Sequence, residues 1–405
     1  MGFDCFMKQK VVVIGHGYTS RLGVIRALGR AGYDVSAIIM LVNKRKGKPD
    51  MTPPVDSYSK YISSVYYCLP DTDSLISLLL EKCVDDSQKV ILIPDSDFSA
   101  AAIDQNQEKL EKHFLFPHIH HTPGAVVAWM SKLRQKETAI KVGLNVAAGD
   151  VIEVVDGKYS LPATIHYPCF PKPLMTLVGA KTGIGRCDSE LELRKVIDLL
   201  MKRSSTISIL VEEYKEIEDE YALLGVSDGK DVHIPGILHL TSLASGSHFG
   251  VAKRGEILPI DGYEDLLDRF KDFVRETGFV GIFDIDFYKS GGRYYFCEMN
   301  FRYGGSGYAY TKSGVNLPAI YAEIMQGKPM DTTAFVREKA VYVNERMCLD
   351  DWYNGFISTR EFKDLRKNCD ISFIADEEDA MPGKQFIQLV KKKGLKRVFR
   401  NIWSK

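Results

Sequence analysis

FVGIFDIDFYKSGGRYYFCEMNFR, residues 279–302, predicts two β-strands joined by a tight turn at the glycine pair. Alternate residues of a strand share one face, so Glu298 and Asn300 project to the same side. Asp286 lies on the preceding strand, and pairing around the turn can set it beside Glu298. Two neighbouring carboxylates repel each other unless a cation lies between them. The segment therefore predicts a hairpin that holds a cation.

The side chains of this face favour magnesium as that cation. Asp286, Glu298 and Asn300 offer hard oxygen ligands, which Mg²⁺ prefers, and Mg²⁺ usually completes its coordination with waters and nucleotide phosphates. Arg302 would then face the phosphates, and its planar guanidinium group can bind two phosphate oxygens at once. These features indicate a phosphoryl-transfer centre. The alternative from this segment alone is a solvated hairpin with ordinary surface ion pairs.

Three upstream segments favour phosphate or nucleotide binding. Lys172 lies in the apolar strand edge PCFPKPLM, where a buried ammonium is costly without an anion. TLVGAKTGIGR, residues 176–186, has the glycines and the lysine of a mobile loop whose amides approach phosphates. SILVEEYKEIEDEY, residues 208–221, is suited to a hinge that binds adenine and ribose. The alternatives are a flexible hairpin for the loop and a charged surface turn for the hinge.

The first 123 residues predict a Rossmann-like α/β domain. Short β-branched runs alternate with helical stretches, which is typical of a parallel sheet covered on both faces. The expected strands are KVVVIGHG, VSAIIM and KVILIPDSD; the expected helices are TDSLISLLLEKCV and SRLGVIRALGRAG, the second capped by Ser20 and ending near Gly32.

From residue 124 the pattern changes to antiparallel α+β. The expected helices are SKLRQKETAIKVGL and SELELRKVIDLLMKR, and the expected strands include DVIEVVDG, KYSLPATI, YPCFPKPLM, SILVEEY and the hairpin YALLGVSDGKDVHIPGILHLT. We expect this domain to span residues 124–335, with a mobile lid at about 150–210. Residues 336–405 form a C-terminal extension.

The order of these features resembles the ATP-grasp superfamily over roughly residues 8–335. A helix-borne lysine (Lys132), Lys172, a glycine loop, an acidic hinge and an Asp…Glu-x-Asn-x-Arg hairpin follow one another. Within the superfamily, VILIPDSD and RYGGSGYAYTKSGVNLP make the chain look most like the carboxylate-amine ligase branch related to D-aspartate ligase. The resemblance implies a ligase that activates a carboxylate as an acyl-phosphate on ATP and joins it to an amine.

The resemblance also assigns roles to individual residues. The implied nucleotide contacts are Lys132, Lys172, Lys181, Gly183, the adenine hinge Glu212, Glu213 and Tyr214, and Glu220 near the ribose. The implied ligands of Mg²⁺ (or Mn²⁺) are Asp286, Glu298 and Asn300; Arg302 and Lys172 are the implied catalytic residues; and the substrate candidates are Arg302, Gly304, Gly305, Arg21 and Asp97. Phe301 replaces the family's usual proline, and Asp286 replaces a frequent glutamate.

Composition narrows the classes of protein. The formal net charge is zero, which gives no sign of a nucleic-acid partner. No apolar run is long enough to span a membrane, and the N-terminus lacks a signal-peptide layout, so we expect a cytoplasmic protein. The eight cysteines contain no CxxC, which argues against zinc and disulfides. A myristoylation motif at Gly2 would favour Ser or Thr at position 6, and this chain has Phe6, which argues against that modification. Expected partners are small carboxylates and amines, among them a cell-wall or glycan precursor, and a second copy of the chain.

The last segment, residues 384–405, carries eight Lys or Arg and no acid. Ile387, Val390, Val398 and Ile402 lie near helical spacing, and we expect Gly394 to interrupt the helix. A basic amphipathic helix can lie on an anionic membrane surface. Packing against its own domain is the commoner alternative.

Three other readings compete with the ligase. A nicotinamide dehydrogenase is suggested by VVVIGHGYTSRLG, but the second strand ends in Asn43 rather than the expected acid. A non-catalytic nucleotide-binding protein would usually have lost a metal ligand, and none is lost. His118 and His120 could share a metal, yet a domain-junction strand is the preferred interpretation of PHIHHTP.

Overall fold

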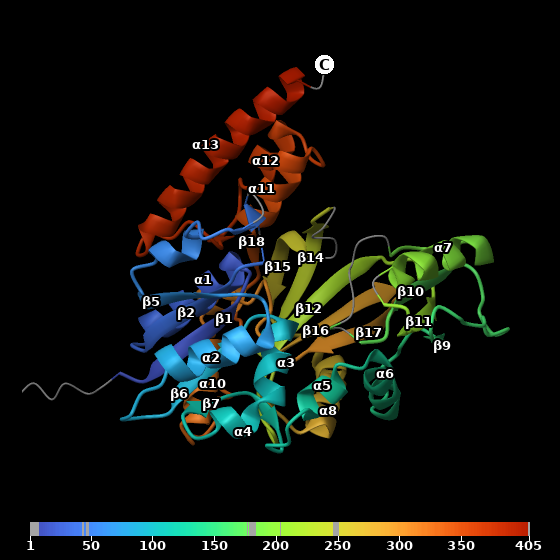
Figure 1. Cartoon of the computed structure of the whole chain (residues 1–405), viewed down its shortest axis with the longest axis horizontal. Helices are drawn as coiled ribbons and strands as arrows, with labels where there is room; N and C mark the ends of the chain where they lie inside the picture. The colour runs from blue at the N-terminus through green and yellow to red at the C-terminus, as the bar shows by residue number, and fades with distance from the viewer. Residues whose placement is uncertain are drawn as a thin grey trace, which may run out of the picture.

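Figure 1 presents the computed structural model of the chain, which describes residues 8–42, 44–45, 48–175, 177, 184–202, 204–245 and 251–403. Side chains are described for all of these except residues 44–45 and 398–403. A large central sheet lies in the middle of the molecule (Figure 1). Around it lie the N-terminal part, a small three-stranded sheet within residues 149–213, and the C-terminal helix.

The N-terminal part contains a parallel sheet, as predicted, and it has five strands where the sequence predicts three. Its order is β5 (Ile62–Cys68), β2 (Asp34–Met40), β1 (Lys10–Gly15), β6 (Val90–Pro94) and β7 (Phe114–Leu115). Successive residues of β1 enter different cores, Val11 and Val13 on one face and Val12 and Ile14 on the other. Both faces are therefore covered, which explains the unbroken apolar run of β1.

The helices of this part are α1 (Tyr18–Arg30), α2 (Thr72–Lys82), α3 (Asp97–Gln105) and α4 (Gln107–Leu110), with a short 3₁₀ helix η1 (Val55–Tyr58) and the small pair β3 (Lys44–Arg45) and β4 (Lys48–Pro49). The expectation that Ser20 caps α1 is wrong, because the helix begins at Tyr18 and its N-cap is Gly17. The Ser20 hydroxyl instead donates to the carbonyl of Gly17 and to Asp95 Oδ2. The hydroxyl of Ser20 therefore contacts Asp95, the residue that follows β6, from inside the first turn of the helix.

The central sheet is mainly antiparallel. Its order is β17 (Arg293–Asn300), β16 (Phe279–Ser290), β12 (Asp219–Asp228), β14 (Ile237–Leu243), β15 (Ala252–Leu258), β18 (Ala340–Val343) and β19 (Ile371–Ser372), with β13 (Val232–His233) on β12 and β8 (His118–Ile119) on β16. The helices of this part of the chain are α5 (Ala125–Trp129), α6 (Lys132–Lys141), α8 (Glu264–Thr277), α9 (Tyr308–Lys312) and α10 (Leu317–Met325). The pairing of β8 with β16 confirms the predicted junction strand.

A second, smaller sheet lies within the predicted lid range. Its strands are β10 (Cys169–Pro173), β11 (Ile207–Glu213) and β9 (Gly149–Val154), and α7 (Glu190–Met201) packs on it around a core of its own. The predicted strand KYSLPATI is wrong, because only Lys158 forms an isolated bridge, to Val155. Asp156 and Gly157 both have positive φ, so the chain turns there instead of extending.

The C-terminal extension is built into the central sheet, since β18 pairs with β15. It continues with α11 (Glu345–Asn354), α12 (Thr359–Leu365) and α13 (Ala380–Trp403). The expectation that Gly394 interrupts the last helix is wrong, because α13 runs through it. A Cβ at Gly394 would lie 3.3 Å from Trp352 Cη2, so glycine permits close packing there. None of the helices in the described residues is both long and apolar enough to cross a membrane.

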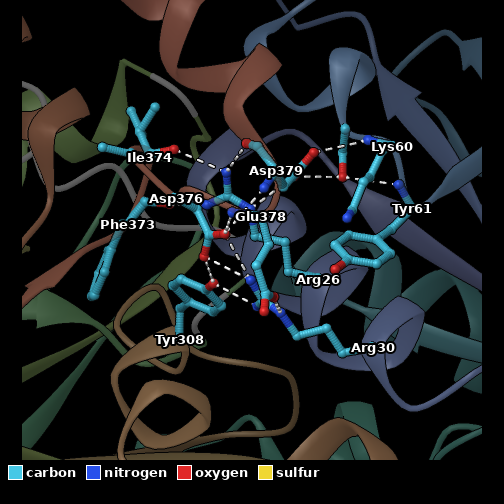
Figure 2. A network of polar contacts seen from close by, with 12 residues as sticks. Arg26, Arg30, Lys60, Tyr61, Tyr308, Phe373, Ile374, Asp376, Glu378 and Asp379 are labelled. Carbon is cyan, nitrogen blue, oxygen red and sulfur yellow. Dashed lines mark hydrogen bonds and ion pairs between the residues drawn. The ribbon is translucent and has the colours of Figure 1, made fainter.

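Two arginines of α1 join the N-terminal part to the C-terminal extension (Figure 2). Arg26 is fully buried and donates from Nε to Asp379 Oδ2 at 2.9 Å and from its two Nη atoms to the carbonyls of Phe373 and Ile374. Arg30 binds Asp376 at 2.7 Å. A buried guanidinium is costly unless it is paired and hydrogen-bonded, and these contacts meet that condition. The network fixes how the two segments face each other.

Arg26→Met should destabilise the protein by about 3 kcal/mol, because Asp379 would remain buried without its cation. The matched control is Lys141→Met, which removes an exposed pair with Glu276 and should cost less than about 1 kcal/mol. Urea unfolding at pH 7 measures both. Equal losses for the two variants would contradict a structural role for the Arg26 network.

Candidate active site

The hairpin β16–β17 places the predicted metal ligands together. Asp286 pairs with Glu298 and Asp284 with Asn300 in the antiparallel register, which confirms the predicted pairing of Asp286 with Glu298. The turn residues Gly291 and Gly292 have φ of 54° and 73°, the left-handed conformation that tight hairpin turns require. A bulge follows Asp286 and absorbs one extra residue of β17.

Each carboxylate of the pair has a polar neighbour from elsewhere in the site. Lys132 Nζ, at the first turn of α6, lies 3.0 Å from Glu298 Oε2. Asn300 Nδ2 donates to Asp286 Oδ2 at 3.4 Å. The lysine thus reduces the repulsion between the two acids, and the amide lies on the face where the sequence predicts it. The arrangement offers two carboxylates and an amide oxygen to a cation.

Lys172 and Lys136 share the carboxylate of Glu212. Lys172 Nζ lies 2.8 Å from Oε2 and Lys136 Nζ lies 2.7 Å from Oε1, and all three side chains are largely buried. Sequence reasoning missed Lys136, although it follows Lys132 by four residues and so shares one face of α6. The three lysines balance the charge of Glu212, Glu298 and Asp286, and their ammonium groups are of the kind that binds phosphate.

The charges in this cluster change the pKa values of its members. Burial alone would lower the pKa of Lys172, but Cys297, Glu212 and Glu298 outweigh it and raise that pKa above its ordinary value. Burial alone would raise the pKa of Glu212, but Lys172 and Lys136 lower it overall. Both groups are therefore charged at neutral pH.

Gln135 holds the backbone between Glu298 and Asn300, the two predicted ligands on β17. Its Nε2 donates to the carbonyl of Met299 at 3.0 Å, and its Oε1 accepts from the Met299 amide at 2.8 Å. This side chain acts as a strand partner for the residue between Glu298 and Asn300. Sequence reasoning gave Gln135 no role, because one helical glutamine carries no signal of a partner so distant in sequence.

Arg302 lies between two acids. Its Nη1 donates to Asp284 Oδ2 at 2.7 Å and its Nε donates to Asp97 Oδ1 at 3.3 Å. The structure thus brings together two predicted substrate residues, Arg302 and Asp97. Asp284 receives no role in the sequence-based prediction; burial raises its pKa, and Arg302 opposes this rise. A Cβ on Gly304 would lie 2.7 Å from Asp284 Cγ, so the loop can pass this close only as glycine.

A cavity of about 680 Å³ opens beside Arg302 and Asp286. Its walls come from the ends of β1 and β6, from α3, from the face of the central sheet and from the start of α11, with Thr72 and Leu177 adding to them. The polar and glycine residues that line it are His16, Gly17, Thr19, Ser20, Thr72, Asp95, Ser96, Asp97, Gln105, Asp284, Asp286, Arg302, Gly305, Ser306, Asn344 and Arg346. The ends of β1 and β6 meet where the strand order reverses, which is where open α/β sheets usually bind ligands.

Arg21 does not reach this cavity. It is fully buried, and it donates from Nε to Asp56 Oδ2 and from Nη1 to the carbonyl of Gly15, both at 2.7 Å. Asp95, next to this pair, lines the cavity; burial raises its pKa to about 6, and Arg21 opposes the rise. Arg21 therefore holds the end of β1 in place beside the cavity through its bond to Gly15.

The predicted nucleotide hinge lies beside the lysine cluster rather than in the cavity. Glu213 accepts from the Ala148 amide at 2.9 Å, and the Arg186 guanidinium lies 4.8 Å from the centre of the Tyr214 ring. Glu220 pairs with Tyr288 across the sheet. The predicted residues Lys181 and Gly183 lie outside the described residues.

The histidine segment shows the geometry of a junction. The rings of His118 and His121 stack with centroids 3.5 Å apart, and His120 and His121 both have positive φ. Among the residues with described placement, no group of three or more His, Cys, Asp or Glu side chains is arranged to hold a metal ion. The predicted magnesium set contains two carboxylates and one amide, so it relies on other ligands to complete the coordination.

Glu212→Gln should destabilise the protein by about 3 kcal/mol at pH 7, because two buried ammonium groups would lose their shared anion. The folded-state pKa of Glu212 is lowered, so its contribution is present above the unfolded pKa of about 4.3 and is lost as the pH falls through the folded value. The difference from wild type should therefore shrink below about pH 4 in urea unfolding.

The matched control is Glu190→Gln, in an exposed pair with Arg194 of the same small domain, which should cost less than about 1 kcal/mol. A Glu212→Gln loss that equals the control, or that stays constant from pH 7 to pH 3.5, would refute the buried charge cluster.

About half of the chain matches a known protein family. Residues 131–333 match the family described as carbamoyl-phosphate synthase L chain, ATP binding domain. The carbamoyl phosphate synthase large chain of Gemmatimonas aurantiaca is 24% identical over 222 residues, which are 54% of this chain and 20% of that protein. The chain thus spans about a fifth of the length of this curated relative.

Solved structures share the fold over most of the chain. The biotin carboxylase domain of Hydrogenobacter thermophilus 2-oxoglutarate carboxylase, solved with MgADP and bicarbonate, has a TM-score of 0.63 at 19% identity and covers 83% of this chain and 74% of that one. The L-amino acid ligase of Bacillus licheniformis has a TM-score of 0.57 at 16% identity and covers 82% and 79%. The chain belongs to the family of the carbamoyl-phosphate synthase L chain ATP-binding domain, within the ATP-grasp superfamily.

Proposed function

We propose that the protein is an ATP-dependent carboxylate-amine ligase. The observation that carries the proposal is the pairing of Asp286 with Glu298 beside a lysine cluster on one side and Arg302 on the other. Carboxylates, lysines and a cavity thus lie next to one another, and we assign them to the metal, the nucleotide phosphates and the substrate. Membership of an ATP-binding family supports the nucleotide part.

The donor set fits a magnesium ion, with manganese as a substitute. Asp286 and Glu298 face each other in register, and Asn300 adds an amide, so the oxygens are of the type that Mg²⁺ selects. When bound, the ion would neutralise phosphate charge and polarise the transferred phosphoryl group. Lys132 lies 3.0 Å from Glu298, so this carboxylate already faces a cationic group.

The lysine cluster would hold the nucleotide phosphates. Lys132 and Lys172 are the predicted ligands, and Lys136 joins them through Glu212. The hinge of Glu212, Glu213 and Tyr214 would bind the adenine, with Glu220 near the ribose. Lys181 and Gly183 would approach the phosphates from the loop of the lid, and Gly185 would give that loop freedom. Closure of the lid over residues 150–210 would exclude water from the reacting groups.

The chemistry requires cations because two anions must meet. A carboxylate oxygen of the acid would attack the γ-phosphorus of ATP, the bond to ADP would break, and an acyl-phosphate would form. The amine nitrogen would then attack the acyl carbon, lose a proton and release phosphate. Arg302 lines the cavity next to Asp286, so it is suited to hold the acid and the phosphoryl oxygens.

The branch related to D-aspartate ligase stays part of the proposal. The cavity is large enough for a small acid and an amine, and Gly305 and Asp97 line it together with Arg302. Gly304 does not line it and packs against Asp284 instead. A cell-wall or glycan precursor, a cytoplasmic location and a homodimer stay predictions. For the C-terminal helix, the packing of Lys393 on Asp350 and of Arg397 on Trp352 favours attachment to its own domain over a membrane.

The test is a phosphate-release screen over carboxylates and amines, with hydroxylamine as a trap for the acyl-phosphate. Acid-dependent hydroxamate, formed only with ATP and Mg²⁺, is the expected result. ATP binding without acid-dependent hydroxamate or phosphate release across a broad panel would refute the ligase and favour a non-catalytic nucleotide-binding protein.

Glu298→Gln should lower the hydroxamate rate on the order of 10²–10³-fold, because one metal-binding charge opposite Asp286 is lost. The control is Glu276→Gln, an exposed acid of α8 that pairs with Lys141 outside the cavity. Its rate should match that of wild type. Full activity of Glu298→Gln would disprove the metal assignment.

A further inference from the structure

Arg346 brings the C-terminal extension into the substrate cavity. It is the second residue of α11, beyond the family match at residues 131–333, and it lines the cavity together with Asn344 and Met347. Its side chain is 18% exposed. This arginine takes no part in the lysine cluster or in the Asp286–Glu298 pair, so its place in the cavity wall needs a separate explanation.

The contacts of Arg346 leave its guanidinium available to a ligand. Its carbon Cζ lies 4.7 Å from the centre of the Tyr18 ring, which orients the planar group by stacking. Its Nε lies 3.7 Å from Asp350 Oδ2, too far for a hydrogen bond, while Lys393 binds the other oxygen of Asp350. Within the described parts of the chain, Arg346 donates no hydrogen bond.

The other charged groups of the cavity wall are engaged differently. Arg302 binds Asp97 and Asp284, and Asp95 accepts from Ser20. Burial lowers the pKa of His16, and Arg346, Arg21 and Arg302 lower it further. His16 is therefore neutral at pH 7, and Asp350, the acid 3.7 Å from Arg346, also binds Lys393, so the Arg346 charge is only partly balanced and this corner of the cavity can receive an anion.

The three anions of the proposed reaction can be assigned to separate cations. The nucleotide phosphates belong to the lysine cluster, and the acid to be activated belongs to Arg302. The remaining cation, Arg346, needs an anion from the second substrate. A zwitterionic amine also matches the cavity, because Asp97 and Asp284 line it and provide negative charge for the ammonium.

We propose that Arg346 binds the carboxylate of the amine substrate, which is an α-amino acid or a short peptide. The inference rests on the proposed ligase function and adds the class of its second substrate. A guanidinium fork binds a carboxylate through two parallel hydrogen bonds, so it discriminates against amines that lack one. Arg346 is thus a residue of specificity, distinct from the phosphoryl-transfer groups.

The activity test compares amines that differ only in the carboxylate. With an accepted acid, ATP and Mg²⁺, wild type should use alanine at least about 10-fold better than ethylamine, or lysine better than cadaverine. Arg346→Gln should raise KM for the amino acid about 10–100-fold and leave the rates with hydroxylamine and with the plain amines unchanged. Arg346→Lys should recover only part, because the charge remains but the fork is lost.

The matched control is Arg360→Gln, which removes an arginine of α12 with a 90% exposed side chain and should change neither parameter. Equal effects of Arg346→Gln on amino acids and plain amines, or no effect on either, would overturn the inference. A preference of wild type for phosphoethanolamine over every amino acid would overturn the carboxylate assignment, because the anionic group would then be a phosphate.

A binding experiment distinguishes a failure of this inference from a failure of the ligase proposal. Calorimetric titration of the intact protein with each amino acid, and with its decarboxylated counterpart, needs no turnover. Binding of an amino acid to wild type that is lost in Arg346→Gln but kept in Arg360→Gln supports the inference even if no hydroxamate forms. Equal binding to wild type and Arg346→Gln, or no amino acid bound by wild type, counts against it. Circular dichroism should confirm that both variants are folded.

Discussion

The repulsion between Asp286 and Glu298 is the constraint on which the site depends. Antiparallel register places the two acids opposite each other at the end of a hairpin, and a tight glycine turn and the Gln135 bonds to Met299 hold that register. Such a pair is stable only where cations are near. Lys132 supplies one, and the oxygens remain suited to a metal. The cationic groups around the hairpin offset this local negative charge.

The rest of the molecule brings cations and walls to this hairpin from distant parts of the chain. Lysines come from α6 and β10, the cavity floor comes from the ends of β1 and β6, and one wall comes from α11. The Arg26 and Arg30 network then fixes the C-terminal extension against α1. A cavity between distant segments keeps its shape only if the segments are joined, and this buried network joins two of them, α1 and the C-terminal extension.

Much of this arrangement could be predicted from the sequence because it depends on short-range patterns. The pairing of Asp286 with Glu298 follows from strand alternation and one turn, and the parallel sheet follows from buried apolar runs. Gln135, Asp284 and Arg346 could not be found in this way, because their partners are distant in sequence. The role of Arg21 was equally hidden, since its burial depends on Asp56 and on the packing of α1. Ser20 failed as a predicted cap for the same reason, because Asp95 competes for its hydroxyl.

The central claim, that the β16–β17 hairpin is the metal-binding centre of an ATP site, is tested most directly by anomalous diffraction. Crystals would be grown with Mn²⁺ and an ATP analogue that cannot be hydrolysed. We predict an anomalous peak coordinated by Asp286 and Glu298, adjacent to the nucleotide phosphates and to Lys172. A bound nucleotide whose metal lies away from both carboxylates would contradict the account.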